Sequence, residues 1–323
     1  MLIEKAELLW SRECPYACVG CTMPNPLRSI KTSHRGTNEQ WREGMKRIKA
    51  LGSRFVAIYG AEPLTRMEGL PEVIESVYET GMKATVITAL PLTHMLKTLL
   101  DTTPLDSVSV SYDAIYTDLF RKTKSESGIR MLLNNPKIKD RAVIATVTRL
   151  NVEEIPIMAR RASDAGLWFL FDLYHPGSGE LSKCGNELNV SSLEPNEQQV
   201  RAMATELLTL KRTGSLIHAS EEYLSHISTL YRGKTRDTWH CVGLPTGWIT
   251  VDADGSILAC DDWQMRFPGG AIWDHGWTGD ELAEWMQEAR SSCAGCAWNT
   301  HFDACGIEAG KISPETYVHG EKR

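Results

Sequence analysis

The sequence has little that would take the chain to a membrane or to nucleic acid. No apolar run approaches the ~20 residues that a membrane-spanning helix needs, so no membrane insertion is expected. The start, MLIEKAELLW, lacks the basic residues and the long apolar stretch that open a signal peptide, which favours a cytoplasmic protein. No basic stripe is present to neutralise phosphate groups, so nucleic-acid binding is disfavoured.

The charge that is present is spread unevenly. The chain of 323 residues has a net charge of −6. Residues 241–323 contain 13 Asp and Glu against 5 Lys and Arg, a balance of −8, which leaves +2 for the first 240 residues. This acidic end favours a small cationic or polyhydroxylated substrate, although a solvated acidic face would show the same balance.

Cysteine is the abundant residue type. In a reducing compartment its nine copies favour metal or redox roles over disulfides. Three cysteines lie within residues 14–21, one lies at position 184, and five lie between 241 and 305. Two groups near the two ends of the chain indicate two metal sites.

Short β-rich runs alternate with helical patterns through the first 175 residues. Six such repeats predict parallel strands joined by right-handed crossovers, and six are too few to close an eight-stranded barrel. We expect an α/β protein, with an open, partial (β/α)6 TIM-like barrel whose chemistry lies at the C-terminal strand ends. The expected strands are 6–10, 54–60, 83–89, 107–112, 142–148 and 167–174, and the expected helices between them are 38–50, 71–80, 93–100, 115–133 and 152–165.

The chain is expected to divide into three parts. Residues 1–190 form the partial barrel, residues 191–240 form connecting helices (195–213 and 219–232), and residues 241–323 form a small second domain. In that last part, GWITVDADGSILACDDW predicts two short strands around an Asp-Gly turn, followed by a helix over 280–290.

The first cysteine group has the spacing C-x3-C-x2-C. Its thiols can bind three irons of a [4Fe–4S] cluster and leave the fourth iron open to a substrate or cofactor. A zinc site is the alternative, but it needs a fourth ligand, and the only nearby histidine, His34, fits no usual knuckle spacing. The metal ligands expected here are Cys14, Cys18 and Cys21.

These residues and two later motifs resemble the radical S-adenosylmethionine (SAM) superfamily. At the end of the second expected strand, YGAEPL resembles the Gly-Gly-Glu-Pro motif of that family. The resemblance implies that Glu62 holds the amino group of SAM, while Gly60 and Ala61 allow the backbone to approach closely. Ala61 stands where the family usually has a second glycine, and Gly20 stands where an aromatic residue usually precedes the third cysteine.

The fourth expected strand carries the other motif. VSVSYDA resembles the Ser-x-Ser/Asp pattern of the family, which implies that Ser109, Ser111 and Asp113 contact the carboxylate or ribose of SAM. The resemblance also implies the reaction type: reductive cleavage of SAM gives a 5′-deoxyadenosyl radical, which takes hydrogen from an unactivated C–H bond. A flavodoxin- or ferredoxin-type electron donor is the expected partner.

The second cysteine group resembles the twitch form of the SPASM domain, which carries an auxiliary iron–sulfur cluster. Four thiolates can close a second [4Fe–4S] cluster, and a zinc ribbon is the alternative. Cys305 either replaces one of these ligands or is a free thiol, and Cys184 is either a structural thiol or a hydrogen-atom donor. The expected ligands are Cys241, Cys260, Cys293 and Cys296.

Two clusters together favour an oxidation, since the second cluster can accept the electron that a substrate radical must lose. The leading hypothesis is a dehydrogenase that converts a carbinol of an aminoglycoside, aminocyclitol or sugar to a ketone. The candidate bases are Arg149 and Asp261 or Asp262. The cluster loop begins at residue 14, which leaves no room in front of it for a leader-peptide domain and favours this small substrate.

Three alternatives remain open. An epimerase would use Cys184 or Cys305 to return a hydrogen atom to the opposite face of the substrate. A peptide-modifying enzyme and a non-catalytic zinc or iron–sulfur binding protein are the other two, and zinc without iron would exclude the enzyme.

Overall fold

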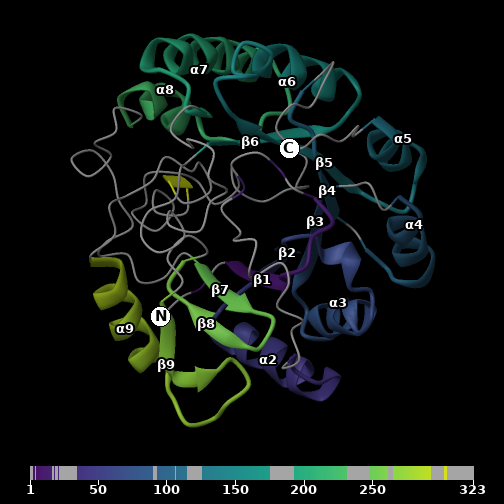
Figure 1. Ribbon diagram of the computed structural model, residues 1–323, viewed down its shortest axis with the longest axis vertical. Coiled ribbons are helices and arrows are strands. Elements are labelled where there is room, and N and C mark those ends of the chain that lie inside the picture. The colour runs from purple at the N-terminus through teal and green to yellow at the C-terminus, as the bar shows by residue number, and fades with distance from the viewer. Residues whose placement is uncertain are drawn as a thin grey trace.

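The structure is a curved, mostly parallel β-sheet with helices on its convex side (Figure 1). It is a computed structural model that describes residues 3, 5–16, 18, 21, 35–89, 93–105, 107–114, 126–174, 193–230, 248–260, 265–291 and 302–303. The strand order is β6-β5-β4-β3-β2-β1-β7-β8-β9. The strands are β1 (Lys5–Ser11), β2 (Phe55–Gly60), β3 (Lys83–Thr88), β4 (Ser107–Ser111), β5 (Asp140–Val147), β6 (Trp168–Leu173), β7 (Trp248–Asp252), β8 (Ser256–Leu258) and β9 (Arg266–Ala271).

The first six strands follow the chain in order and pair in parallel, which confirms the α/β fold with a mostly parallel sheet. Helices connect them in the described part of the chain, and α2 begins with a capping box between Thr37 and Gln40. Helix α7, which follows β6, begins with a capping box between Asn196 and Gln199. The helical elements are α2 (Asn38–Ala50), η1 (Pro63–Thr65), α3 (Leu70–Glu79), α4 (Thr93–Thr102), α5 (Glu126–Asn134), α6 (Ile155–Asp164), α7 (Glu197–Arg212), α8 (Glu221–Leu230) and α9 (Gly279–Ser291).

The two faces of the sheet differ in polarity. In β1, Ala6, Leu8 and Trp10 pack into the large apolar cluster that includes residues of α2 and α3. Successive residues of a strand point to opposite faces, so Glu7 and Ser11 face the inside of the curve. Buried polar residues share that inner face in other strands: Thr85, Ser107, Ser109, Ser111 and Thr250. The sheet therefore has an apolar helix-covered side and an inner side that carries buried polar groups beside apolar residues such as Leu9 and Trp248.

The strands of the expected second domain extend the barrel sheet. β7 pairs with β1 in parallel, from Lys5 opposite Trp248 to Leu9 opposite Asp252. The hairpin around the Asp-Gly turn is present, because β8 pairs with β7 in antiparallel fashion. β9 was not expected, and it pairs with β8. The boundaries at residues 190 and 240 stay a prediction, as does an auxiliary-cluster domain.

Among the helices, the expected segment 115–133 is described only from Glu126 onward, and residues 115–125 lie outside the described part. Helix α9 begins and ends within one residue of the predicted range 280–290. None of the described helices combines the length and apolar character that crossing a membrane would require.

Candidate active site

The three N-terminal cysteines lie on the segment that leaves the C-terminal end of β1. Cys18 is buried, and Cys14 and Cys21 are half-buried. The N–H of Cys21 donates to the carbonyl oxygen of Cys18 at 3.3 Å, and the N–H of Tyr16 donates to Sγ of Cys14 at 3.5 Å. Cys18 and Cys21 share a small packed group with Tyr16, Tyr174 and Leu193.

This donor set fits an iron–sulfur cluster. Three thiols on one short loop match three of its irons, each thiolate binding a different iron. Within the described residues, no three His, Cys, Asp or Glu side chains converge as the ligands of a single ion do.

Two tyrosines show which strand ends meet at the loop. Burial raises the pKa of Tyr16 to about 12, and the negative charges of Glu62, Cys14 and Cys18 add to the effect. Burial likewise raises the pKa of Tyr174, beyond the end of β6, to about 12, with Glu194 and Cys21 contributing. Both phenols stay protonated, and the ends of β1, β2 and β6 therefore face the cysteine loop together.

The YGAEPL motif is bound to this loop by its backbone. The N–H of Ala61 donates to the carbonyl oxygen of Ser11 at 2.8 Å, and the N–H of Glu62 donates to that of Glu13 at 3.1 Å. Gly60 has a φ of +150°, and a Cβ atom there would collide with the Ser11 carbonyl oxygen. The glycine is therefore needed for the close approach of the β2 end to the cysteine loop.

The Glu62 side chain is fully buried and accepts three hydrogen bonds. Oε1 accepts from the hydroxyl of Thr88 at 2.7 Å and from the N–H of Leu64 at 3.1 Å. Oε2 accepts from the N–H of Ala89 at 2.8 Å. A carboxylate has about four acceptor positions, so most of this one is already used to join the ends of β2 and β3. Its expected contact with the amino group of SAM stays a prediction.

Ser109, Ser111 and Asp113 are buried at the end of β4. Oδ1 of Asp113 accepts from the N–H of Thr146 at 2.6 Å, and its carbonyl oxygen accepts from Nδ2 of Asn151 at 2.6 Å. Asp113 therefore links β4 to β5. Contacts of these three residues with SAM stay predictions.

Arg149 follows β5 and is exposed. Its N–H donates to the carbonyl oxygen of Leu193 at 2.7 Å, which brings the segment before α7 to the end of β5. A guanidinium stays protonated in proteins, so Arg149 suits an electrostatic role better than that of a base.

The second expected metal site is described only at Cys260. This half-buried residue follows β8, which runs antiparallel to β7, so it lies toward the edge of the sheet where β1 begins. The cysteine loop lies at the other edge, and β1 spans about 20 Å from Lys5 to Ser11 at ~3.3 Å per residue. The other candidates lie outside the described residues: Cys184, Cys241, Asp261, Asp262, Cys293, Cys296 and Cys305.

Several residues of the site were not predicted. Thr88 and Glu194 carry no motif, although a polar residue at the end of an apolar strand was a usable signal for Thr88. Burial raises the pKa of the Glu194 carboxyl above its ordinary value. Arg12 and Asp252 form a buried ion pair between the ends of β1 and β7, and no local pattern connects them.

Comparison with known proteins finds a family that matches about the first half of the chain. The model of the radical SAM superfamily matches residues 8–160. These residues form a radical SAM domain. The match supports SAM binding and one [4Fe–4S] cluster, and it contains the cysteine loop and the segments YGAEPL and VSVSYDA.

Solved structures show that the likeness extends along the chain. A tagged form of anSMEcpe with bound AdoMet is 16% identical over 98% of each chain, with a TM-score of 0.62. SuiB of Streptococcus suis bound to S-adenosylmethionine is 14% identical, covering 99% of this chain and 77% of SuiB, with a TM-score of 0.62. The complex of SuiB with its precursor peptide SuiA is also 14% identical and gives a TM-score of 0.63, with 99% and 75% covered. At these identities the shared property is the fold.

Proposed function

We propose that the protein is a dehydrogenase that uses its radical SAM domain to oxidise a carbinol. The proposed substrate is a small, polar, cationic compound of the aminoglycoside, aminocyclitol or sugar class. When bound, SAM and the N-terminal cluster supply a 5′-deoxyadenosyl radical for hydrogen abstraction. Oxidation would remove one hydrogen atom from the carbinol carbon, a proton from its hydroxyl to a base, and one electron, which a second cluster would be able to accept. The product is a ketone, two hydrogens lighter than the substrate.

The observation that carries the oxidation is the position of Cys260. It lies on a hairpin whose strand β7 pairs with β1, the strand that leads into the cysteine loop. A cluster bound there, with Cys241, Cys293 and Cys296 as the proposed further ligands, would lie across the barrel sheet from the first cluster. Full ligation by thiolates suits an electron carrier, because no iron is left open for substrate.

The polar inner face supports a polar substrate. Glu7 is buried there, forms an ion pair with Lys5 at 2.5 Å and accepts from the hydroxyl of Tyr59 at 3.3 Å. The hydroxyl of Ser107 donates to that of Thr85 at 2.8 Å. An apolar ligand would leave such groups poorly matched, whereas a hydroxylated ligand can exchange hydrogen bonds with them. The acidic balance of residues 241–323 supports a positive charge on the substrate.

Glu194 is the described carboxyl best suited to act as the base. Its charge acts on Tyr174 together with that of Cys21, and burial raises the pKa of its carboxyl, which favours proton uptake. Asp261 and Arg149 remain the candidates proposed from the sequence, with Arg149 better placed to bind an anionic group.

Two other functions remain as alternatives. An epimerase would need Cys184 or Cys305 as hydrogen-atom donor, and both were proposed from the sequence alone. A peptide substrate is favoured by the likeness to SuiB, which has been solved with its precursor peptide SuiA.

The test uses anaerobically reconstituted protein with SAM, a flavodoxin- or ferredoxin-type reductant and a panel of aminoglycoside precursors. We expect 5′-deoxyadenosine together with a product about 2 Da lighter. Unchanged mass with one deuterium gained from heavy water would replace the dehydrogenase by an epimerase, and turnover of peptides alone would replace the substrate class. Glu194→Gln should slow product formation while leaving uncoupled SAM cleavage intact, and Glu206→Gln on the exposed face of α7 is the matched control.

A further inference from the structure

A buried ion pair reaches the cysteine loop from the side opposite the YGAEPL motif. Arg12 directly follows β1, stands two residues before Cys14 and is 5% exposed. Its Nε donates to Oδ1 of Asp252 at 2.8 Å, and its Nη2 donates to Oδ2. Two parallel bonds of this kind fix the orientation of the guanidinium as well as its position.

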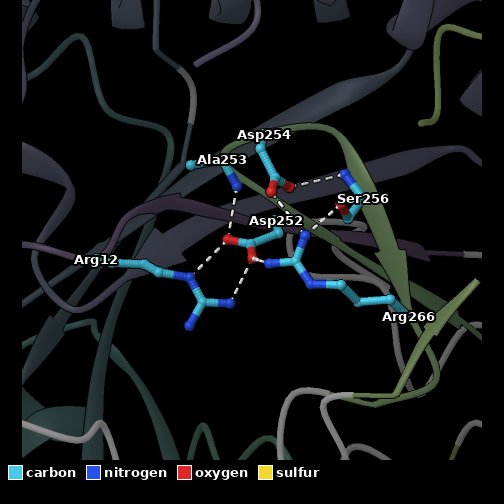
Figure 2. Close-up of polar contacts among 6 residues, drawn as sticks. All are labelled: Arg12, Asp252, Ala253, Asp254, Ser256 and Arg266. Carbon is cyan, nitrogen blue, oxygen red and sulfur yellow. Dashed lines mark hydrogen bonds and ion pairs between the residues drawn. The ribbon is translucent and has the colours of Figure 1, made fainter. Parts of the chain in front are cut away.

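Asp252 is the last residue of β7 and is 2% exposed. Besides Arg12, its carboxylate accepts from the N–H of Ala253 at 2.8 Å and from Nη2 of Arg266 at 3.0 Å. Figure 2 shows the carboxylate between the two guanidinium groups. The charge of Arg12 is thus neutralised by a residue that is itself held from a third strand.

Arg266 lies at the start of β9, and its position is set by further contacts. Its Nη1 donates to Oδ2 of Asp254 at 2.6 Å and to the hydroxyl of Ser256 at 2.5 Å (Figure 2). The hairpin between β8 and β9 also carries Cys260. One chain of contacts therefore runs from this hairpin through Asp252 to the residue that enters the cysteine loop.

We propose that Asp252 is a positioning residue for the N-terminal cluster loop, acting through Arg12 while Arg266 holds its carboxylate in place. On the β2 side the loop is bound through backbone hydrogen bonds to Ser11 and Glu13. On the β7 side, Asp252 supplies the buried negative charge that holds the guanidinium of Arg12 in its buried position. The inference rests on the radical SAM domain and is independent of the oxidation proposed above.

The test replaces Asp252 by asparagine, which keeps its shape and removes its charge. Reconstituted full-length protein is compared with the wild type by iron content, by hydrogen exchange of residues 11–16, and by the change that SAM causes in the electron paramagnetic resonance spectrum of the reduced protein. Only a cluster with an open iron binds SAM, so the SAM-dependent difference spectrum isolates the N-terminal cluster.

For Asp252→Asn we expect loop exchange about tenfold faster and SAM binding about tenfold weaker, with an altered difference spectrum, since losing one charge-assisted contact corresponds to roughly that factor. A folded variant with wild-type exchange, affinity and spectrum would overturn the proposal. Arg212→Gln removes an exposed ion pair with Glu221 far along the chain and should leave all three readouts unchanged.

Arg12→Lys keeps the test decisive if Asp252→Asn does not fold. Lysine retains the charge and loses the two-point geometry, so the same spectroscopic change is expected at a smaller stability loss. Arg266→Gln should give an intermediate change, because Arg12 still binds the carboxylate. If Arg12→Lys folds and matches the wild type in all three readouts, Asp252 has no positioning role.

Discussion

Two buried carboxylates flank the strand that leads into the cysteine loop, and they are satisfied in different ways. Glu62, after β2, accepts from neutral donors: a hydroxyl and two backbone N–H groups. Asp252, at the end of β7, is held by two arginines and one N–H. The first belongs to a motif that lies within the radical SAM match, and the second lies about 90 positions beyond the end of that match.

The difference shows two ways to hold one loop. On the β2 side the backbone of Ala61 and Glu62 is bonded directly to Ser11 and Glu13, so the side chain of Glu62 is needed to shape its own segment. On the β7 side no such bond to Ser11 or Glu13 is found among the described residues, and the connection runs through two charged side chains. Removing charge should therefore matter more on the β7 side than on the β2 side.

The largest expected effect is the loss of stability in Asp252→Ala, set against Glu62→Ala. Asp252→Ala removes the carboxylate that the 5%-exposed Arg12 binds at two points and should lower the free energy of unfolding by about 4 kcal/mol. Glu62→Ala leaves neutral donors without an acceptor and should cost about 2 kcal/mol. Urea unfolding of both variants, followed by circular dichroism under anaerobic conditions, measures the two losses.

Exposed ion pairs supply the control for this comparison. Lys97→Gln breaks the pair with Asp101 on the surface of α4, and it should leave the free energy of unfolding almost unchanged because solvent screens this exposed pair. If Glu62→Ala lowers the free energy of unfolding as much as Asp252→Ala, the contrast is wrong between Glu62, bound by neutral donors, and the charged anchor formed by Arg12, Asp252 and Arg266.

A smaller effect is expected where the β2 side depends on close backbone approach. Gly60→Ala places a Cβ atom against the Ser11 carbonyl oxygen at a left-handed φ, and should cost about 3 kcal/mol. Gly81→Ala is a matched control, since Gly81 has a φ of +75° and nothing within 4 Å of its Cβ position. The control should lose only about 1 kcal/mol of backbone strain.

Both variants should be measured by urea unfolding together with iron content after reconstitution. Gly60→Ala should also bind less iron, because the collision falls on the residue that precedes the cysteine loop. Equal losses in Gly60→Ala and Gly81→Ala would show that the close approach to Ser11 contributes nothing.

Much of the β2 side could be predicted from the sequence, and little of the β7 side could be. YGAEPL follows an apolar strand directly, so its place at a strand end and its approach to the cluster loop follow from local order. Arg12 and Asp252 are 240 positions apart, and nothing near either residue specifies the other. Their contact exists because β7 pairs in parallel with β1, and such a long-range register is not encoded in local periodicity.

The limited reach of local sequence patterns also explains why one turn of the C-terminal part was predicted and one strand was missed. The turn around Gly255 was predicted because Asp-Gly has a local conformational preference, and it was found. β9 was missed because RFPGGA contains Pro268, Gly269 and Gly270, which weaken a strand signal. Pairing with β8 overrides that weak propensity.

The smallest expected effect concerns the acid sensitivity of the Asp254–Arg266 pair, the outer end of the charged anchor. Burial alone would raise the pKa of Asp254, but hydrogen bonds from Arg266 and Ser256 outweigh it and lower the pKa below 3.8. A carboxyl with a lowered pKa in the folded state adds stability that is fully present above its unfolded pKa and is lost as the pH falls through the folded value. The pair is half-exposed, so its contribution should be about 1 kcal/mol at most and should shrink in high salt.

The pH dependence of the stability change in Asp254→Asn therefore tests whether the Asp254–Arg266 pair supports the Arg12–Asp252 pair. The difference in unfolding free energy between wild type and Asp254→Asn should be constant from pH 5 to 7 and should disappear as the pH falls below 3.8. In Arg266→Gln the same Asp254→Asn change should have a smaller effect at every pH, since the main hydrogen-bond donor is gone. A difference that persists at acid pH, or that is unaltered in the Arg266→Gln background, would mean that Asp254 acts through its shape in the turn and that the charged anchor ends at Arg266.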